Sequence, residues 1–275
     1  MPEGDTIYRT ASTLQRAIGR QQVTRFESVL PQLERVDFDT PLAGRTVEKV
    51  EPYGKWLLIY FSGDLILLTH MLMSGSWHIY RPGERWQKSR FHMRIVIETA
   101  AMVAVAFNVP VAEFHTERSL ARREGFNRLG PAPLAEDFDA EQAIANLAAR
   151  RDLELGLALL DQKLMAGLGN VLKSEVAFAC GLNPFRLVGT LSRDQLEELV
   201  ATSRKFLLAN ITHTSGESPV SNVPYRRTTG RTEPEANLWV YQRVGKPCRR
   251  CATPIRSAKH RADGRISFWC PVCQP

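Results

Sequence analysis

The chain has 275 residues, of which 44% are hydrophobic and 24% charged, a composition typical of globular proteins and a length sufficient for about two domains with a further small module. Its longest apolar runs, residues 56–61 and 65–68, are too short to cross a bilayer, and its acidic opening is unlike a signal peptide. We therefore expect an intracellular protein without a membrane partner, and the formal net charge of +7 favours a polyanionic partner.

The first predicted element is a helix that begins near Gly4 and stops before Gly19. Its apolar positions recur at helical spacing, at Ile7, Ala11, Leu14 and Ile18. Short strand-like stretches follow, separated by turns rich in Gly, Asp and small residues: residues 46–50, 56–61, 65–71, 94–98 and 102–107. This pattern favours an antiparallel β-sandwich or barrel over a parallel sheet.

The composition becomes helical after residue 130. Gly130-Pro131-Ala132-Pro133 is typical of a linker. Helices are then predicted over residues 140–149, over 153–164 as a buried helix, over 171–179 with Asn170 as N-cap, and from Ser192 to about residue 209. Ser192 with Gln195 three residues later indicates a capping box.

Residues 212–236 are rich in Thr, Ser, Pro, Gly and Arg and contain no predicted element. A connection of this length is usually functional or mobile. With Arg226, Arg227 and Arg231 it is either a segment that closes over a ligand or a disordered linker.

Two Cys-x-x-Cys pairs close the chain, Cys248 with Cys251 and Cys270 with Cys273. Four thiolates in two short hairpins suit one tetrahedral structural zinc ion. The alternative is a pair of disulfides, but Cys180 is the single further cysteine and nothing indicates secretion.

The segment between the two cysteine pairs contains Asp263-Gly264, a strong hairpin-turn signal. The metal is therefore predicted to hold a hairpin whose tip carries Arg261 and Arg265, side chains suited to phosphate. Arg265 could instead only cover the zinc site.

The amino terminus offers a different chemistry. Met1 precedes a small residue, so its removal is expected, which leaves Pro2 with a secondary amine. An α-amino group titrates near pH 8, and such amines attack aldehyde-like carbons to form iminium ions. Glu3 beside it is a possible proton donor or acceptor. Against this, Pro and Glu are common at helix starts without any catalytic role.

Four motifs, in order along nearly the whole chain, resemble bacterial formamidopyrimidine-DNA glycosylases and endonuclease VIII. Met1-Pro2-Glu3-Gly4-Asp5 is similar to the endonuclease VIII opening, and residues 53–58, Tyr-Gly-Lys-Trp-Leu-Leu, to its lysine-bearing strand. Gly167-Leu168-Gly169-Asn170 resembles the turn of its helix–two-turn–helix domain, and residues 265–274 its zinc-finger end. Residues 73–76, Met-Ser-Gly-Ser, depart from the endonuclease VIII pattern and look more like the formamidopyrimidine branch.

The resemblance implies an α+β multidomain fold with double-stranded DNA in a cleft between two lobes. Residues 1–130 would form a catalytic β-sandwich with an N-terminal helix, residues 131–236 a helix–two-turn–helix domain with a long loop, and residues 237–275 a β-hairpin zinc finger.

The resemblance also implies residue roles. Pro2 would be the nucleophile on the sugar carbon that bears a damaged base, and Glu3 the proton donor that helps to open the sugar. Lys55 would act in β-elimination, and Arg265 would act in δ-elimination and bind phosphate. Taken without this context, Lys55 is an ordinary solvated strand residue.

Further residues would contact DNA without taking part in the chemistry. Asn170 and Arg128 would contact the backbone, although the first could be only a cap and the second only a surface charge. Leu72 and Met73 would fill the void that a flipped-out base leaves, with a plain core position as the alternative for Met73. Glu175 is expected to support the turn or to face solvent, and Cys180 to be a small buried hydrophobe.

The sequence thus predicts a bifunctional DNA glycosylase and abasic-site lyase of base excision repair, with oxidised pyrimidines favoured. We expect a monomer associated with the bacterial nucleoid in the cytoplasm, bound to duplex DNA that holds damaged bases or abasic sites. One alternative is a non-catalytic damaged-DNA-binding protein of the same fold. Another is an unrelated enzyme that uses an amino-terminal proline, such as a tautomerase.

Overall fold

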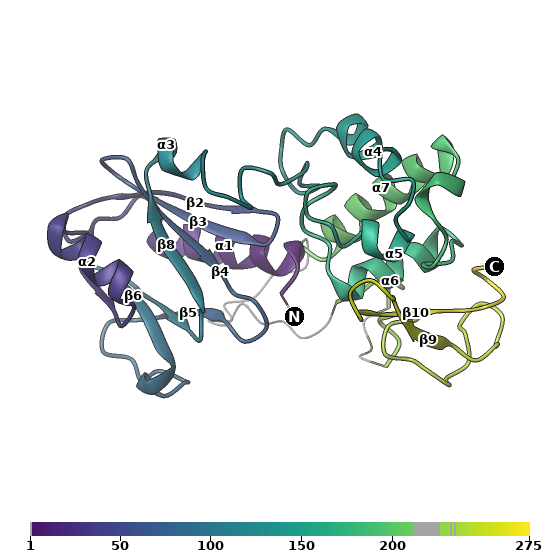
Figure 1. Ribbon diagram of the computed structural model, residues 1–275. Coiled ribbons are helices and arrows are strands. Elements are labelled where there is room, and N and C mark those ends of the chain that lie inside the picture. Colours follow the sequence, from purple (N-terminus) through teal and green to yellow (C-terminus); the bar gives the residue numbers. More distant parts are fainter. Residues whose placement is uncertain (1, 212–225, 232, 234) are drawn as a thin grey trace. The chain divides into compact units, whose positions relative to one another are not determined.

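The computed structural model describes residues 2–211, 226–231, 233 and 235–275, and the chain divides into two compact units (Figure 1). The described residues up to Arg128 belong to the first unit, and those from Leu129 onward to the second. Within the described residues, no helix combines the length and the apolar character that crossing a membrane requires.

The first unit contains two four-stranded antiparallel sheets, with strand orders β2-β3-β4-β8 and β1-β6-β7-β5. The strands are β1 (Val23–Ser28), β2 (Val47–Tyr53), β3 (Trp56–Phe61), β4 (Leu65–His70), β5 (Ser76–Tyr80), β6 (Met93–Thr99), β7 (Val103–Phe107) and β8 (Val111–His115). The helical elements are α1 (Gly4–Ile18), α2 (Pro31–Asp39), the 3-10 turn η1 (Arg90–His92) and α3 (Glu117–Leu120). The predicted sandwich is confirmed; β1, β5, β8 and α2 were not predicted.

One apolar cluster joins the two sheets and α1, and it explains the sequence pattern. All four apolar positions of the predicted first helix are buried in this cluster. Along β3, Leu57 and Ile59 also face it, whereas Leu58 packs on the opposite face against Leu120 of α3. Because both faces of β3 are covered, the strand is apolar throughout rather than alternating.

The second unit is helical up to a terminal hairpin. Its elements are α4 (Ala140–Ala148), α5 (Leu155–Ala158), α6 (Asn170–Ala179), the 3-10 turn η2 (Val188–Thr190), α7 (Arg193–Ala209), β9 (Arg256–Lys259) and β10 (Ile266–Trp269). The predicted capping box of α7 is present, with Ser192 Oγ accepting from Gln195 N and Gln195 Oε1 accepting from Ser192 N. Helices α4, α6 and α7 match their predicted positions to within a residue or two.

The predicted long helix over residues 153–164 is wrong, because only α5 is helical there. The first amides of α5 donate to Arg186 O and Pro184 O, and the Gln162 side chain donates to Leu160 O just beyond it. The two bonds at its first amides tie the start of α5 to a separate segment, and the helix begins only at Leu155. The apolar residues are nevertheless buried, as expected.

Gly130 and Pro131 do not form a free linker. Gly130 N donates to Gln162 O at 2.9 Å, and Ala166 N donates to Pro131 O at 3.0 Å. The segment is therefore fixed to the turn that precedes α6. Most of the predicted polar connection, residues 212–225 together with 232 and 234, lies outside the described residues.

Candidate functional site

The first residues of the chain are anchored to α1. Pro2 and Glu3 are both buried, and Glu3 is the N-cap residue of the helix. The carbonyl oxygen of Glu3 accepts from Thr6 N at 2.9 Å and from Ile7 N at 3.1 Å. The positive end of the helix dipole therefore lies at the candidate nucleophile and its neighbour, where it favours anionic groups.

Helix α1 runs antiparallel to β2, which brings the β2–β3 turn toward the start of the helix. Arg20 N donates to Val47 O, and further along the strand Val50 N donates to Gln15 Oε1, both at 2.6 Å. Each step forward on β2 thus corresponds to a step back along α1. Figure 1 shows the start of α1, the β2–β3 turn and the β4–β5 connection at the same end of the first unit.

Lys55 occupies the turn between β2 and β3 and not a strand, which corrects the predicted strand position. Tyr53 pairs with Trp56, so Gly54 and Lys55 form a two-residue hairpin loop. Gly54 has φ 58°, the left-handed value that the first position of such a loop requires and that glycine adopts without strain. The short loop holds Lys55 at the end of the sheet.

His70 connects this turn with the β4–β5 connection. In the β3–β4 ladder His70 is the partner of Trp56, and the two rings lie 4.7 Å apart. His70 Nδ1 accepts from Leu72 N at 3.0 Å. Burial, with the nearby cations Lys55 and Arg123 adding to it, lowers the pKa of His70 to about 4. His70 is therefore neutral at pH 7, carries its proton on Nε2, and lies within the electrostatic reach of Lys55.

Leu72 and Met73 point into solvent from a tight turn. They are 47% and 70% exposed, so the core position considered for Met73 is wrong. Leu72 has φ 45°, and Gly75 N closes the turn on Met71 O at 2.8 Å. A Cβ at Gly75 would lie 2.6 Å from Met71 O, so glycine is needed there. Exposed apolar side chains on a rigid turn suit insertion between bases.

In the second unit, α6 begins at Asn170, and Gly169 is its N-cap, one residue earlier than predicted. Gly169 contributes no side-chain cap to the first turn. The Oδ1 atom of Asn170 is buried, and no hydrogen-bond partner occurs for it among the described residues. The backbone amides at this helix N-terminus suit an anion, whereas the buried Oδ1 is an acceptor and suits a hydrogen-bond donor.

Gln162, which sequence reasoning missed, shapes the turn before α6. Its Nε2 donates to Leu160 O at 2.7 Å and Leu168 O at 3.0 Å, and its Oε1 accepts from Gly167 N at 2.9 Å. Its backbone oxygen also accepts from Gly130 N, two residues after the exposed Arg128. Through its backbone oxygen and its side chain together, Gln162 thus joins the segment that follows Arg128 to the turn that presents Asn170.

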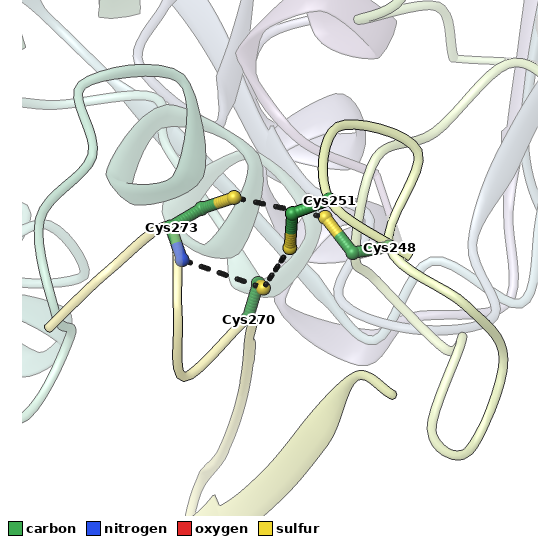
Figure 2. A group of neighbouring side chains, drawn as sticks. All are labelled: Cys248, Cys251, Cys270 and Cys273. Atoms are coloured by element: carbon green, nitrogen blue, oxygen red, sulfur yellow. Dashed lines mark hydrogen bonds between the residues drawn. The ribbon is translucent and has the colours of Figure 1, made fainter. Parts of the chain in front are cut away.

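The four cysteines of the two pairs come together at the end of the chain (Figure 2). Their sulfur atoms all lie within 4.8 Å of one another, with Cys251–Cys270 at 3.4 Å and Cys248–Cys273 at 3.9 Å. Tetrahedral zinc with bonds of about 2.3 Å to sulfur separates its ligands by roughly 3.8 Å. The donor set and its spacing therefore fit a closed structural zinc site.

The cysteine cluster holds the predicted hairpin, β9 paired with β10, with residues 260–265 at its tip. Arg261 and Arg265 are exposed there. Asp263 Oδ1 accepts from Arg265 N at 2.9 Å, and Asp263 Oδ2 lies 3.4 Å from Arg265 Nε. The guanidinium is 56% exposed and is available to a second anion.

Glu175, on the second turn of α6, is fully buried, so the expectation of a solvent-facing residue is wrong and that of a supporting residue is right. Its two carboxylate oxygens accept from three successive backbone amides and from one hydroxyl: Trp239 N, Val240 N, Tyr241 N and Thr228 Oγ1. Sequence alone offers no signal for these partners, because they lie far along the chain.

Two models of known protein families match this chain, one in each half. The model described as the formamidopyrimidine-DNA glycosylase N-terminal domain matches residues 1–111, and the model described as the formamidopyrimidine-DNA glycosylase H2TH domain matches residues 129–221.

Relatives match over the whole chain. The probable endonuclease 8 2 of Streptomyces coelicolor is 39% identical, covering 100% of this chain and 94% of that protein. The DNA-(apurinic or apyrimidinic site) lyase Nei2 of Mycolicibacterium smegmatis is 36% identical, covering 100% and 99%.

Solved structures share the fold. Lactococcus lactis Fpg (MutM) in complex with DNA containing N7-benzyl-Fapy-dG has a TM-score of 0.81 and 24% identity, over 99% of both chains. The same Lactococcus lactis protein with abasic-site DNA has a TM-score of 0.80 and 23% identity, over 99% of both chains. At these identities the likeness establishes the architecture: an N-terminal helix and β-sandwich, a helical domain and a C-terminal hairpin.

Proposed function

The chain belongs to the formamidopyrimidine-DNA glycosylase and endonuclease 8 family, and on that basis we propose that it is a bifunctional DNA glycosylase and abasic-site lyase of base excision repair. Its substrate is duplex DNA that contains an oxidised base, with pyrimidines favoured, or an abasic site. It acts as a monomer on chromosomal DNA in the bacterial cytoplasm. The observation that carries the proposal is full-length likeness to a named abasic-site lyase, combined with Pro2 and Glu3 at the start of a buried helix.

The first step is attack on the sugar. After removal of Met1, the Pro2 nitrogen forms a bond to C1′ as the bond from C1′ to the damaged base breaks. The base leaves with the bonding electron pair and takes up a proton, which balances the proton that the Pro2 nitrogen loses. Glu3 gives a proton to the ring oxygen, so the C1′–O4′ bond opens and the iminium ion forms.

Strand cleavage follows from the iminium ion, which acts as an electron sink. Loss of a C2′ proton and cleavage of the C3′–O bond release the 3′ phosphate, and loss of a C4′ proton with cleavage of the C5′–O bond releases the 5′ phosphate. Lys55 serves the first elimination and Arg265 the second, where each cation stabilises the charge on the departing phosphate. Water then releases the sugar remnant from Pro2.

DNA binding requires further residues. Asn170, at the start of α6, and the exposed Arg128 contact phosphates of the backbone. Leu72 and Met73 occupy the gap left by the extruded base. Their exposure on a turn at the same sheet end as Lys55 supports this role.

We assign these roles to the three expected domains: residues 1–130 carry the nucleophile and Arg128, residues 131–236 carry Asn170, and residues 237–275 present Arg265. One zinc ion, held by Cys248, Cys251, Cys270 and Cys273, has a structural role only. Bound zinc contributes folding energy to the hairpin and takes no part in the chemistry.

Borohydride trapping tests the proposal. The full chain, with removal of Met1 verified by mass spectrometry, is incubated with a duplex that holds an abasic site and with sodium borohydride. A covalent protein–DNA adduct is expected, and it should be lost in Pro2→Gly but retained in Pro82→Gly, an exposed loop proline. Binding without an adduct would identify a non-catalytic damage-binding protein, and the absence of both would end the proposal.

A further inference from the structure

A second group of polar side chains is buried at the base of the cysteine-held hairpin. His260 is 1% exposed and lies between two partners. Its Nδ1 is 2.6 Å from Glu154 Oε2, the N-cap residue of α5, and its Nε2 is 2.7 Å from Ser267 Oγ on β10. The three side chains form a continuous hydrogen-bonded chain from the helical part of the unit to the hairpin.

A hydroxyl, an imidazole and a carboxylate in this order also form the triad of serine hydrolases. Here Ser267 is fully buried, so no substrate reaches its oxygen. The role of the group is therefore to fix position. Burial lowers the pKa of His260, and the nearby Lys173 acts in the same direction, whereas the hydrogen bond to Glu154 opposes them. A neutral ring that donates from Nδ1 to Glu154 can accept at Nε2 from Ser267.

The His260 ring is closely packed on two sides. A Cβ at Gly156 of α5 would lie 2.6 Å from His260 Nε2 and 3.0 Å from Ser267 Oγ, so only glycine admits the ring. On another side the ring lies 4.6 Å from that of Phe185. Lys173 of α6, which is also fully buried, donates from Nζ to Ile266 O at 2.9 Å beside the same strand.

The backbone of His260 is bonded directly to the arginine tip. His260 N donates to Arg265 O at 2.9 Å, and Gly264 N donates to His260 O at 3.0 Å. All four residues of β9, which lead into His260, are exposed and supply no apolar anchor. The position of the Arg265 backbone therefore depends on the ring of His260 more than on the strand before it.

From this geometry we propose that His260, held by Glu154 and Ser267, is a positioning residue that fixes the Arg265 side chain for phosphate. The inference rests on the proposed role of Arg265 in the second elimination. A displacement of about 1 Å in a charge-stabilising group can slow a reaction by up to roughly a hundredfold. Loosening the anchor should therefore slow the second elimination and leave the attack by Pro2 in place.

The test measures both eliminations on a duplex with a preformed abasic site, using the full chain. Glu154→Leu removes the partner of Nδ1, Glu154→Gln keeps a hydrogen-bond acceptor there, and Gly156→Ala displaces the ring by its added methyl group. Zinc content is measured in each variant as a check on the hairpin. We expect Glu154→Leu and Gly156→Ala to slow the second elimination about tenfold relative to the first, and Glu154→Gln to restore most of it.

A double-variant cycle separates positioning from general damage. In the Arg265→Ala background, Glu154→Leu should cause no further loss of the second elimination, because the group that it positions is absent. A further loss of similar size would overturn the inference, as would unchanged product ratios in both Glu154→Leu and Gly156→Ala. If Arg265→Ala itself leaves the product ratio unchanged, the proposed role of Arg265 fails, and this outcome is distinct from failure of the His260 anchor.

Discussion

The carboxylate of Glu175 accepts a hydrogen bond from the backbone amide of Val240 at 2.9 Å, across 65 positions of the chain. With its bonds to Trp239, Tyr241 and Thr228, this one side chain holds the segment that leads to the zinc finger against α6. A buried carboxylate that is satisfied in this way contributes to stability because its removal takes an acceptor away from three successive backbone amides.

Glu175→Ala should therefore destabilise the second unit strongly. Three backbone amides would lose their acceptor, and we expect the free energy of unfolding to fall by about 3 kcal/mol or more. Urea unfolding measures the change. Glu198→Ala, on the exposed side of α7, is the control and should stay within about 0.5 kcal/mol. Equal effects of the two variants would contradict the structural role of Glu175.

Lys55→Met should raise the pKa of His70, because one of the cations that depress it is removed. The pKa should rise above its present value of about 4 but stay below 6.5, since burial is the largest cause of the shift. Titration of the ring protons by NMR gives the value. No change in the pKa of His70 would mean that the β2–β3 turn and the β4–β5 connection are not neighbours.

The same variant, Lys55→Met, should slow the first elimination about tenfold or more.

The free energy of unfolding of the first unit should decrease as the pH is lowered from 6.5 to 4. Burial lowers the pKa of His78 to about 4 with Lys88 adding to the effect, and the pKa of His70 is similarly low. In this range the unfolded chain binds protons that the folded protein does not, so each histidine costs about 1.4 kcal/mol per pH unit below 6.5. Above pH 6.5 both histidines are neutral in the folded and the unfolded chain, so their protonation no longer lowers the free energy of unfolding.

The pH dependence is measured by urea unfolding at pH 7 and pH 5, followed through the fluorescence of the buried Trp77. His78→Gln retains polar atoms near Ser76 and Tyr80 but does not titrate there, so it should lose less stability between the two pH values than the parent protein does. A parallel loss in both proteins would show that His78 does not contribute.

Met73→Ala and Met71→Ala form a matched pair on one turn. Met73 is 70% exposed, so its truncation should change stability by less than about 0.5 kcal/mol while weakening binding to lesion-containing duplex. Met71 is 0% exposed, and its truncation should cost about 2 to 5 kcal/mol of stability. Fluorescence anisotropy with lesion and intact duplexes measures binding. Unchanged lesion affinity in Met73→Ala would exclude Met73 as the void-filling residue.

Removing one zinc ligand should reduce DNA affinity and its dependence on salt. Cys251→Ser leaves the hairpin without its folding energy, so the arginines of its tip no longer bind phosphate. The slope of log affinity against log salt should become shallower by about 0.9 for each phosphate that the tip had neutralised. The control is Cys180→Ser, which changes a cysteine outside the cluster. Burial raises the pKa of the Cys180 thiol to about 11. An unchanged slope in Cys251→Ser would show that the tip does not bind phosphate.

Structural elements that depend on interactions between neighbouring residues in the sequence could be predicted. The apolar spacing of α1, the Ser192 capping box and the Asp263-Gly264 turn each act within a few residues, and all three are present. The placement of Lys55 in a strand and of Asn170 as a cap failed by a residue, because a tight turn and a glycine cap leave little trace in the pattern. The short strands β1, β5 and β8 lack a strong alternation.

Long-range polar partners could not be predicted at all. His260 meets Glu154 across 106 positions, and the backbone oxygen of Gln162 accepts from Gly130 N, far earlier in the chain. These bonds set the position of the candidate site residues. Sequence motifs thus pointed to the candidate reacting groups, whereas the buried bonds around them required coordinates.

Helix α6 has a consequence for how the protein is made. Two of its buried charged side chains, Lys173 and Glu175, find their partners between Thr228 and Ile266, which the ribosome adds well after α6. Until that part of the chain emerges, both charges would have to enter the interior unpaired, at a cost of several kcal/mol. We therefore expect the second unit to remain incompletely folded on the nascent chain, so that premature termination yields a product for proteolysis instead of a half-active enzyme.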